Sequence, residues 1–203
     1  MEWWRATAPA AARRARMQEI HLTRANWLLR ALWETVWLLL FRPSLTPMFA
    51  WRRLLLRLFG ARLGKQARVY GTARIWAPWN LRMDDHSCLG PYVICYSVAT
   101  VHLGRHASVS QYSHLCTASH DYRQLAMPTI AAPITLQDEA WVAADAFIGP
   151  GVTIGRGAIV GARSTVTGNV VPWSVVAGSP PRQVGARTPF EREPILSRRG
   201  AAE

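Results

Sequence analysis

Residues 154–166 read IGRGAIVGARSTV, and apolar residues recur in them at a fixed interval. Ile154, Val160 and Val166 stand six residues apart, and a glycine follows each of the first two. With shifts allowed only between groups of three, the same period yields fifteen positions, all apolar. The other twelve are Leu63, Val69, Ile75, Met83, Leu89, Cys95, Leu103, Val109, Leu115, Leu136, Val142 and Ile148. A period of six fits neither the two-residue period of a sandwich strand nor the 3.6-residue period of a helical repeat.

A second column of residues, four positions after each member of the first, tests this register independently. It consists of Ala67, Ala73, Trp79, Ser87, Val93, Ala99, Ala107, Ser113, Ser119, Ala140, Ala146, Val152, Ala158, Ser164 and Val170. Only Trp79 is large, as expected if the first column points into a narrow tube and the second lies at its corners. The sequence therefore predicts an all-β fold, a parallel β-helix of about five stacked coils with three short strands each. The period alone leaves the handedness open.

The composition is that of a globular chain whose basic character lies at one end. Of 203 residues, 50% are hydrophobic and 18% are charged, which suits one domain with an appendage. The formal net charge is +12, and residues 1–62 supply +8 of it from eleven arginines and three glutamates. Because Lys65 is the only lysine, genome composition can account for this excess, and we expect no nucleic-acid partner.

The cysteines and the start of the chain bear on its location. Cys88, Cys95 and Cys116 are odd in number and lack metal-type spacing, so a disulfide framework is not expected. Arginines precede the first apolar stretch, and no small-residue cleavage site follows it cleanly, which is unlike a signal peptide. We therefore expect a cytoplasmic protein.

Insertions between the coils all leave from one corner of the predicted tube. Two extra residues follow each of the first two coils, and a longer excess, the projecting loop 121–135, follows the third. Alignment at this corner places four residues in one column: Asn80, Thr100, His120 and Thr153. His102 falls in an adjoining turn. A long loop that projects from a rigid wall beside a histidine is a typical location of a functional site.

The N-terminal extension, residues 1–62, is basic, rich in Trp and Leu, and predicted to be helical. Arg30 and Glu34 interrupt its first apolar stretch, which therefore falls short of the roughly 20 residues that span a bilayer. A basic amphipathic segment can lie in a membrane interface, in which case residues 26–62 hold the protein peripherally at the inner face of the cell membrane. It can equally pack on the first coil or on a neighbouring subunit, and the sequence leaves these alternatives open.

Five segments together resemble a known family. They are WRRLLLRLFGARLG (51–64), PWNL (78–81), VSQYSHLCTASHD (109–121), WVAADAFIGPG (141–151) and VAGSPPR (176–182). The resemblance covers about residues 51–182 and is to the left-handed β-helix, or hexapeptide-repeat, acyltransferases, and within them to the colanic acid biosynthesis acetyltransferases. It implies left-handed coils, a homotrimer, active sites at the clefts between subunits, and acetyl-CoA as co-substrate.

His120 is the expected general base. Acetyl transfer to an alcohol needs a group that removes the hydroxyl proton, and histidine, with a free pKa of about 6.5, suits that task. His120 also matches the family's catalytic histidine within Ser119-His120-Asp121. Asp121 either orients this base or caps its own turn. Asn80, His102 and Trp141 are the expected contacts for the acceptor, and His114 is a further histidine in the third coil.

The cofactor positions follow from the resemblance. In the family the pantetheine arm lies along turns with small side chains, and the matching positions here are Ala144, Ala162 and Thr167, with Arg182 placed to meet phosphate. This chain has Thr167-Gly168-Asn169 where relatives have Thr-Lys-Asp, which puts one phosphate contact in doubt. Arg163 and Arg187 are the candidates to replace it.

The sequence thus predicts three parts: the extension 1–62, a catalytic β-helix 63–171 and a C-terminal cap and tail 172–203. The expected function is O-acetyl transfer to a sugar hydroxyl of an exopolysaccharide precursor, free or lipid-linked. A small free acceptor such as serine, an amino sugar or a xenobiotic is an alternative. Two others are a zinc hydratase of the carbonic anhydrase type, which would use histidines shared between subunits, and a non-catalytic assembly platform. For the main function no metal is expected.

Overall fold

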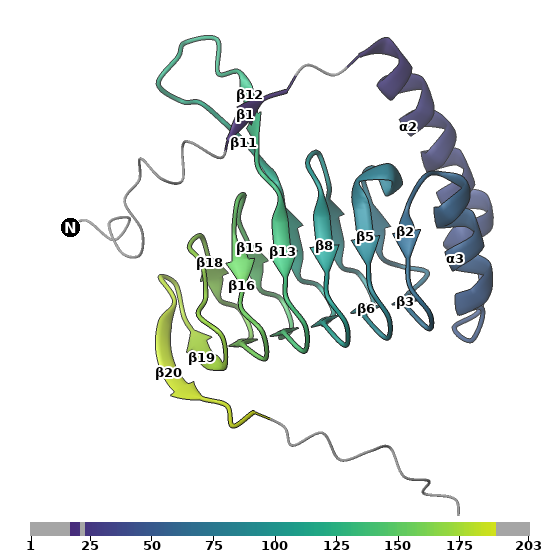
Figure 1. Cartoon of the computed structure of the whole chain (residues 1–203). Coiled ribbons are helices and arrows are strands. Elements are labelled where there is room, and N and C mark those ends of the chain that lie inside the picture. The colour runs from purple at the N-terminus through teal and green to yellow at the C-terminus, as the bar shows by residue number, and fades with distance from the viewer. Residues whose placement is uncertain (1–16, 21–22, 190–203) are drawn as a thin grey trace, which may run out of the picture.

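The computed structural model describes residues 17–20 and 23–189. The predicted features of residues 1–16, 21–22 and 190–203, including the arginines nearest the N-terminus and the end of the tail, lie outside the described residues. Within the described part, a long parallel β-solenoid runs from a helical N-terminal end to a C-terminal strand pair, and one hairpin projects from its side (Figure 1).

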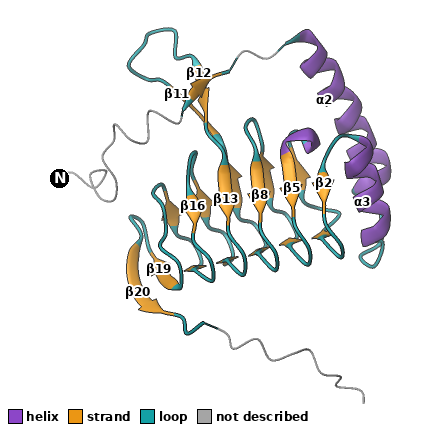
Figure 2. Cartoon of the chain, in the orientation of Figure 1, coloured by secondary structure: helices purple, strands orange, loops and turns teal. Residues whose placement is uncertain are grey.

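The solenoid has three faces, each a stack of short parallel strands (Figure 2). The first face holds β2 (Arg62–Leu63), β5 (Leu81–Met83), β8 (Val101–Leu103), β13 (Ile134–Leu136) and β16 (Thr153–Ile154). The second holds β3 (Arg68–Val69), β6 (Cys88–Leu89), β9 (Ser108–Val109), β14 (Trp141–Val142), β17 (Ile159–Val160) and β19 (Ser174–Ala177). The third holds β4 (Arg74–Ile75), β7 (Ile94–Tyr96), β10 (His114–Cys116), β15 (Phe147–Ile148) and β18 (Thr165–Val166). At the C-terminal end β20 (Arg182–Ala186) pairs antiparallel with β19.

The predicted interior column is confirmed, because all fifteen of its members are buried. Twelve of the fifteen corner positions are buried as well. The prediction is wrong at Trp79, Ala99 and Ser119, which follow the third face and are half-buried or exposed.

At this corner the buried positions are Ala77, Ser97 and Thr117, two residues earlier. The hydroxyl oxygens of Ser97 and Thr117 accept hydrogen bonds from the main-chain N–H groups of Ala77 and Ala99, both at 3.0 Å. These bonds satisfy buried backbone donors, so the chain turns before the expected residues.

The predicted column is wrong for His120 and Thr153, whereas Asn80 and Thr100 lie in register, since the residues that follow them, Leu81 and Val101, pair. Thr153 pairs with Thr135, which pairs with His102, within the first face. His120 instead lies in a hairpin that leaves the solenoid, formed by β11 (Ala118–His120) and β12 (Thr129–Ala131). The chain therefore departs three residues before the predicted loop 121–135, and it rejoins the wall at Ile134 in β13.

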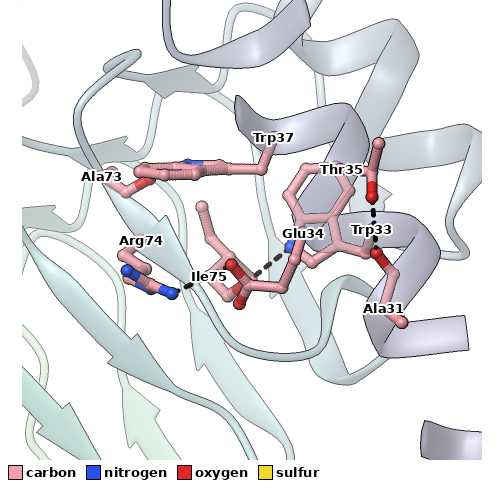
Figure 3. Close-up of polar contacts among 8 residues, drawn as sticks. All are labelled: Ala31, Trp33, Glu34, Thr35, Trp37, Ala73, Arg74 and Ile75. Atoms are coloured by element: carbon pink, nitrogen blue, oxygen red, sulfur yellow. Dashed lines mark hydrogen bonds and ion pairs between the residues drawn. The ribbon is translucent and has the colours of Figure 1, made fainter. Parts of the chain in front are cut away.

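Helices of the extension cover the first coil (Figure 1). They are α2 (Arg24–Val36), a π-helical turn η1 (Trp37–Phe41) and α3 (Phe49–Leu58). A short 3₁₀ helix, η2 (Pro78–Asn80), lies farther along the chain between β4 and β5. The indole N–H groups of Trp33 and Trp37 donate to the carbonyl oxygens of Ile75 and Ala73 at 2.7 and 2.9 Å (Figure 3). The predicted alternative that this segment packs on the first coil is therefore confirmed for one of its sides.

The length and sequence of the described helices do not suit them to cross a bilayer. A feature that the sequence did not indicate is β1 (Gln18–Glu19), which pairs antiparallel with β12. The three-stranded sheet β1-β12-β11 thus joins the start of the extension to the projecting hairpin (Figure 1).

Candidate active site

The projecting hairpin is anchored by a small apolar cluster separate from the solenoid core. Val98, Ala118 and Ala131 are buried in it, and Ile20, Trp76, Tyr96 and Ala99 pack against them. Trp76 and Tyr96 meet edge to face, with ring centroids 5.5 Å apart. The cluster fixes the base of the hairpin, while His120 lies beyond it at the end of β11, exposed.

The His120 imidazole is held by one main-chain contact. Its Nδ1 lies 2.8 Å from the carbonyl oxygen of Met127, across the hairpin. A carbonyl oxygen can only accept a hydrogen bond, so Nδ1 carries the proton and, in the neutral ring, Nε2 keeps its lone pair. An exposed imidazole with Nε2 free to accept a proton is the form that a general base requires.

The Asp121 carboxylate caps the turn that follows His120. Its two oxygens lie 3.3 Å from the Arg123 N–H and 3.1 Å from the Gln124 side-chain nitrogen, both of which donate. This contact set is the turn-capping alternative of the two that the sequence left open. An orienting role of Asp121 toward the base stays a prediction.

His102 lies on the first face, where its Nε2 is 3.0 Å from a carboxylate oxygen of Asp84. A hollow of about 390 Å³ opens beside it. Its lining consists of His102, Gly104, Thr135, Leu136, Gln137, Asp138 and Arg156. Asn80 is used differently, because its side-chain nitrogen donates to the carbonyl oxygens of Ser97 and Val98 at 2.9 and 2.8 Å. Asn80 therefore fastens the hairpin corner, and a role toward the acceptor stays a prediction.

Trp141 lies on β14 in the second face, 44% exposed, and its indole N–H donates to the Ser110 hydroxyl at 2.9 Å. The hairpin with His120 leaves the corner between the third and first faces, which is the corner opposite the second face of a three-sided tube. Within one chain, the structure therefore does not bring Trp141 and His120 together.

The predicted cofactor positions line the C-terminal half of the solenoid. Ala144 and Ala162 occupy successive turns between the second and third faces, and the Arg163 N–H donates to the Ala144 carbonyl at 2.9 Å. Thr167 is exposed after β18, and Arg182 is exposed at the start of β20. We call the line of turns that carries Ala144 and Ala162 the ridge. Its small side chains leave room for a ligand to approach the backbone.

The residues around the missing lysine have identifiable roles. The Asn169 side-chain oxygen accepts from the Thr153 N–H at 2.9 Å and so belongs to the wall. Arg187 donates to the carbonyl oxygens of Glu139 and Gly157 at 3.1 and 3.4 Å. Arg163 has a side chain 84% exposed, 3.3 Å from Asp145. Of the two candidate substitutes, Arg163 is therefore the one whose guanidinium faces solvent.

The remaining candidate groups fit packing. Burial raises the pKa of the Cys95 thiol to about 12 and also raises the pKa of Cys88 and of Cys116, so these thiols stay protonated near neutral pH. Burial lowers the pKa of His114, whose ring meets Phe147 edge to face. Among the residues that the structure describes, no three or more His, Cys, Asp or Glu side chains are grouped so that they could hold a metal ion.

The class of protein follows from the repeat. The chain forms a parallel solenoid of hexapeptide coils, and residues 133–168 match the family of bacterial transferase hexapeptide repeats (six repeats). WcaF of Escherichia coli K12, named for an acetyltransferase of colanic acid biosynthesis, is 39% identical over 149 residues, which are 73% of this chain and 82% of WcaF. The chain therefore belongs to the family of hexapeptide-repeat acetyltransferases.

Solved structures agree with this assignment. The hexapeptide-repeat acetyltransferase VCA0836 of Vibrio cholerae, solved in complex with acetyl coenzyme A, superposes with a TM-score of 0.74 at 29% identity, covering 82% of this chain and 91% of that one. The maltose O-acetyltransferase of Clostridium difficile 630 superposes with the same TM-score of 0.74 at 23% identity, covering 82% of this chain and 90% of that one. The second likeness is one of fold.

Proposed function

We propose that the protein transfers acetyl from acetyl-CoA to a sugar hydroxyl, with His120 as general base. The observation that carries the proposal is the contact between His120 Nδ1 and the Met127 carbonyl, because it sets the tautomer with an open Nε2. No other described histidine combines exposure, a hairpin that projects from the wall and a main-chain acceptor at Nδ1. His102, for comparison, has its Nε2 beside the Asp84 carboxylate.

In this mechanism His120 Nε2 takes the proton from the acceptor hydroxyl as the oxygen bonds to the thioester carbonyl carbon. Backbone N–H groups at the turns stabilise the negative charge that develops on the carbonyl oxygen. When the carbon–sulfur bond breaks, the His120 imidazolium returns the proton to the departing sulfur, which gives free coenzyme A and the O-acetyl sugar. Direct transfer needs only base, carbonyl and hydroxyl in one place, so no acyl-enzyme is required.

Acetyl-CoA as the donor is supported by the complex of the Vibrio cholerae relative and by the open ridge at Ala144 and Ala162. Arg182, exposed at the end of this ridge, is proposed to meet a phosphate. Thr167 is proposed to contact the pantetheine arm. Both assignments rest on the match of these positions to the family pattern.

The active form is proposed to be a homotrimer of left-handed solenoids, with sites at the clefts between subunits. The separation of Trp141 from His120 within one chain supports this, because a site that includes both needs two chains. The acceptor is proposed to be a sugar of an exopolysaccharide precursor, carried on lipid and met at the inner face of the cell membrane. The name of WcaF supports this choice of acceptor.

The test is an acceptor panel with purified full-length protein and acetyl-CoA. Free coenzyme A is measured by thiol release, and the product by mass spectrometry and NMR, for lipid-linked and free saccharides, an amino sugar, serine and chloramphenicol. The proposal predicts turnover with a saccharide and an acetyl ester on one hydroxyl. Turnover confined to serine, or an acetyl amide as product, would overturn it.

A further inference from the structure

The outward side of the N-terminal helices carries several exposed leucines. Leu28, Leu32 and Leu39 are 73%, 55% and 63% exposed. Leu28 and Leu32 of α2 point away from the stripe of Trp33 and Trp37, which are 0% and 8% exposed and cover the first coil. The same helical segment is thus apolar on the side that faces the core and on the side that faces away.

The π-helical turn η1 extends this face. The Arg42 N–H donates to the Trp37 carbonyl at 2.8 Å, the five-residue spacing of a π-helix. Trp37 and Phe41 at the two ends of the turn are buried, while the three leucines between them, Leu38 to Leu40, are all exposed. Beyond the turn, further exposed leucines are Leu45, Leu54 and Leu58. We call Leu28, Leu32, Leu38, Leu39, Leu40, Leu45, Leu54 and Leu58 the leucine face.

Exposure of so many leucine side chains to water is energetically unfavourable. A surface helix places charged or polar residues opposite its buried stripe, and a helix that is apolar all round is covered on both sides. Isolated exposed leucines are ordinary, but eight of them within two helices and the segment that joins them point to an interaction site.

The charges around the leucine face identify what covers it. Glu34 is the only carboxylate among residues 23–62, and its oxygen lies 2.9 Å from the Arg74 guanidinium (Figure 3). The same residues include seven arginines, of which Arg24, Arg42, Arg57 and Arg62 are exposed. We call these four exposed arginines, which belong to the same segment as the leucine face, the arginine rim, and their positive charge matches anionic lipid headgroups. It disfavours a twofold contact between copies, since that would bring the arginine rims together.

We propose that the leucine face docks on an anionic phospholipid bilayer, with leucine side chains in the interface and the arginine rim at the headgroups. This arrangement holds the solenoid at the membrane without spanning it. The inference names the contact by which the proposed enzyme would reach a lipid-linked acceptor. Vesicle binding is measured without acetyl transfer, so a failure here leaves the proposed activity standing.

The test is flotation of the full-length protein with phosphatidylcholine vesicles, with and without about 30% phosphatidylglycerol. We expect binding to the anionic vesicles that high salt weakens, because ions screen the arginine rim. The triple variant Leu28→Gln, Leu32→Gln, Leu39→Gln should bind about tenfold more weakly or worse, since it removes apolar area that the bilayer buries.

The matched control is Leu125→Gln, a leucine 102% exposed at the hairpin tip, which should bind as the wild type does. Circular dichroism and the thermal midpoint check that each variant folds, and the single variant Leu28→Gln replaces the triple one if that fails. Undiminished binding of the folded variant would overturn the proposal. Absence of wild-type binding would also overturn it. So would a triple variant that forms a smaller oligomer than the wild type by light scattering, because the leucine face would then be a contact between copies.

Discussion

The solenoid wall and the projecting hairpin hold their residues by opposite means. In the wall, every interior side chain is buried and each inner strand pairs on both sides. In the hairpin, strands of three residues rest on one small cluster, and the loop beyond it carries Tyr122 and Leu125 at 79% and 102% exposure. The wall alternates buried and outward positions, so its side chains stay at the surface of the solenoid and do not project beyond it. The interruption of the repeat does so, and it carries the proposed base.

The largest effect expected from this contrast is on turnover. His120→Ala should lower kcat by about two to four orders of magnitude, the usual share of a general base, because no other group would accept the hydroxyl proton. Initial rates at saturating acetyl-CoA measure it. His86→Asn is the control, since this histidine lies in a turn of the wall at φ 61°, a conformation that asparagine tolerates. A His120→Ala enzyme with more than half of the wild-type rate would remove His120 as the base.

The second-largest difference between the wall and the hairpin is expected in their contributions to the free energy of unfolding. Leu115 is fully buried in the third face. Leu115→Ala should lower the free energy of unfolding by about 2–5 kcal/mol, because a close-packed tube cannot collapse onto the cavity. Val98→Ala, in the hairpin cluster, should cost about 1 kcal/mol. Denaturant unfolding of both variants measures the difference. Equal losses would mean that hairpin and wall form one cooperative unit of uniform strength.

The strand β1 tests whether the hairpin must be held for activity. The Ile20 N–H donates to the Thr129 carbonyl at 3.0 Å, and Thr129 pairs with His120. Ile20→Pro removes that donor and should lower kcat by about tenfold, because a base displaced by a fraction of an ångström loses its alignment. The thermal midpoint should barely change. Ile20→Val keeps the N–H and should be near wild type; a similar loss in both variants would point to packing instead.

The smallest effect is expected at the far end of the wall. Arg182→Ala should raise the KM for acetyl-CoA by about three- to tenfold and leave kcat nearly unchanged, since a contact remote from the carbonyl acts alike on ground and transition states. Arg182→Lys keeps the charge, so its KM for acetyl-CoA should lie between those of the wild type and of Arg182→Ala. An unchanged KM in the alanine variant would place the phosphate elsewhere, with exposed Arg163 as the next candidate.

The sequence predicted the structural features that repeat along the solenoid and missed those that occur only once. Apolar residues at every sixth position recur often enough to fix the interior of the wall. The departure of the hairpin at Ala118 could not be read, because it depends on hydroxyls such as that of Thr117 accepting a backbone N–H. The two-residue strand β1 has no periodic signal at all, and its pairing spans more than a hundred residues.

For the candidate site, the sequence indicated the identity of His120 but not the contact that sets its tautomer. That contact comes from the main chain of Met127, and any residue type supplies a carbonyl oxygen. The pairing of His102 with Asp84 was equally hidden, since it joins successive coils across eighteen positions. Arg52 of α3 is fully buried, and nothing in the sequence distinguished it from the other arginines of the extension.

The side-chain donors on the helices also decide where the stack stops. Five carbonyl oxygens of the first coil accept from side chains rather than from another strand: those of Leu63, Ala67, Val69, Ala73 and Ile75, which receive Arg57, Arg53, Arg52, Trp37 and Trp33. A bare edge of this kind would be a template on which further chains could polymerise. In the described part of the chain these five acceptors are occupied at one end, and at the other end β20 runs antiparallel along β19, so neither of these edges offers a parallel strand template for another copy.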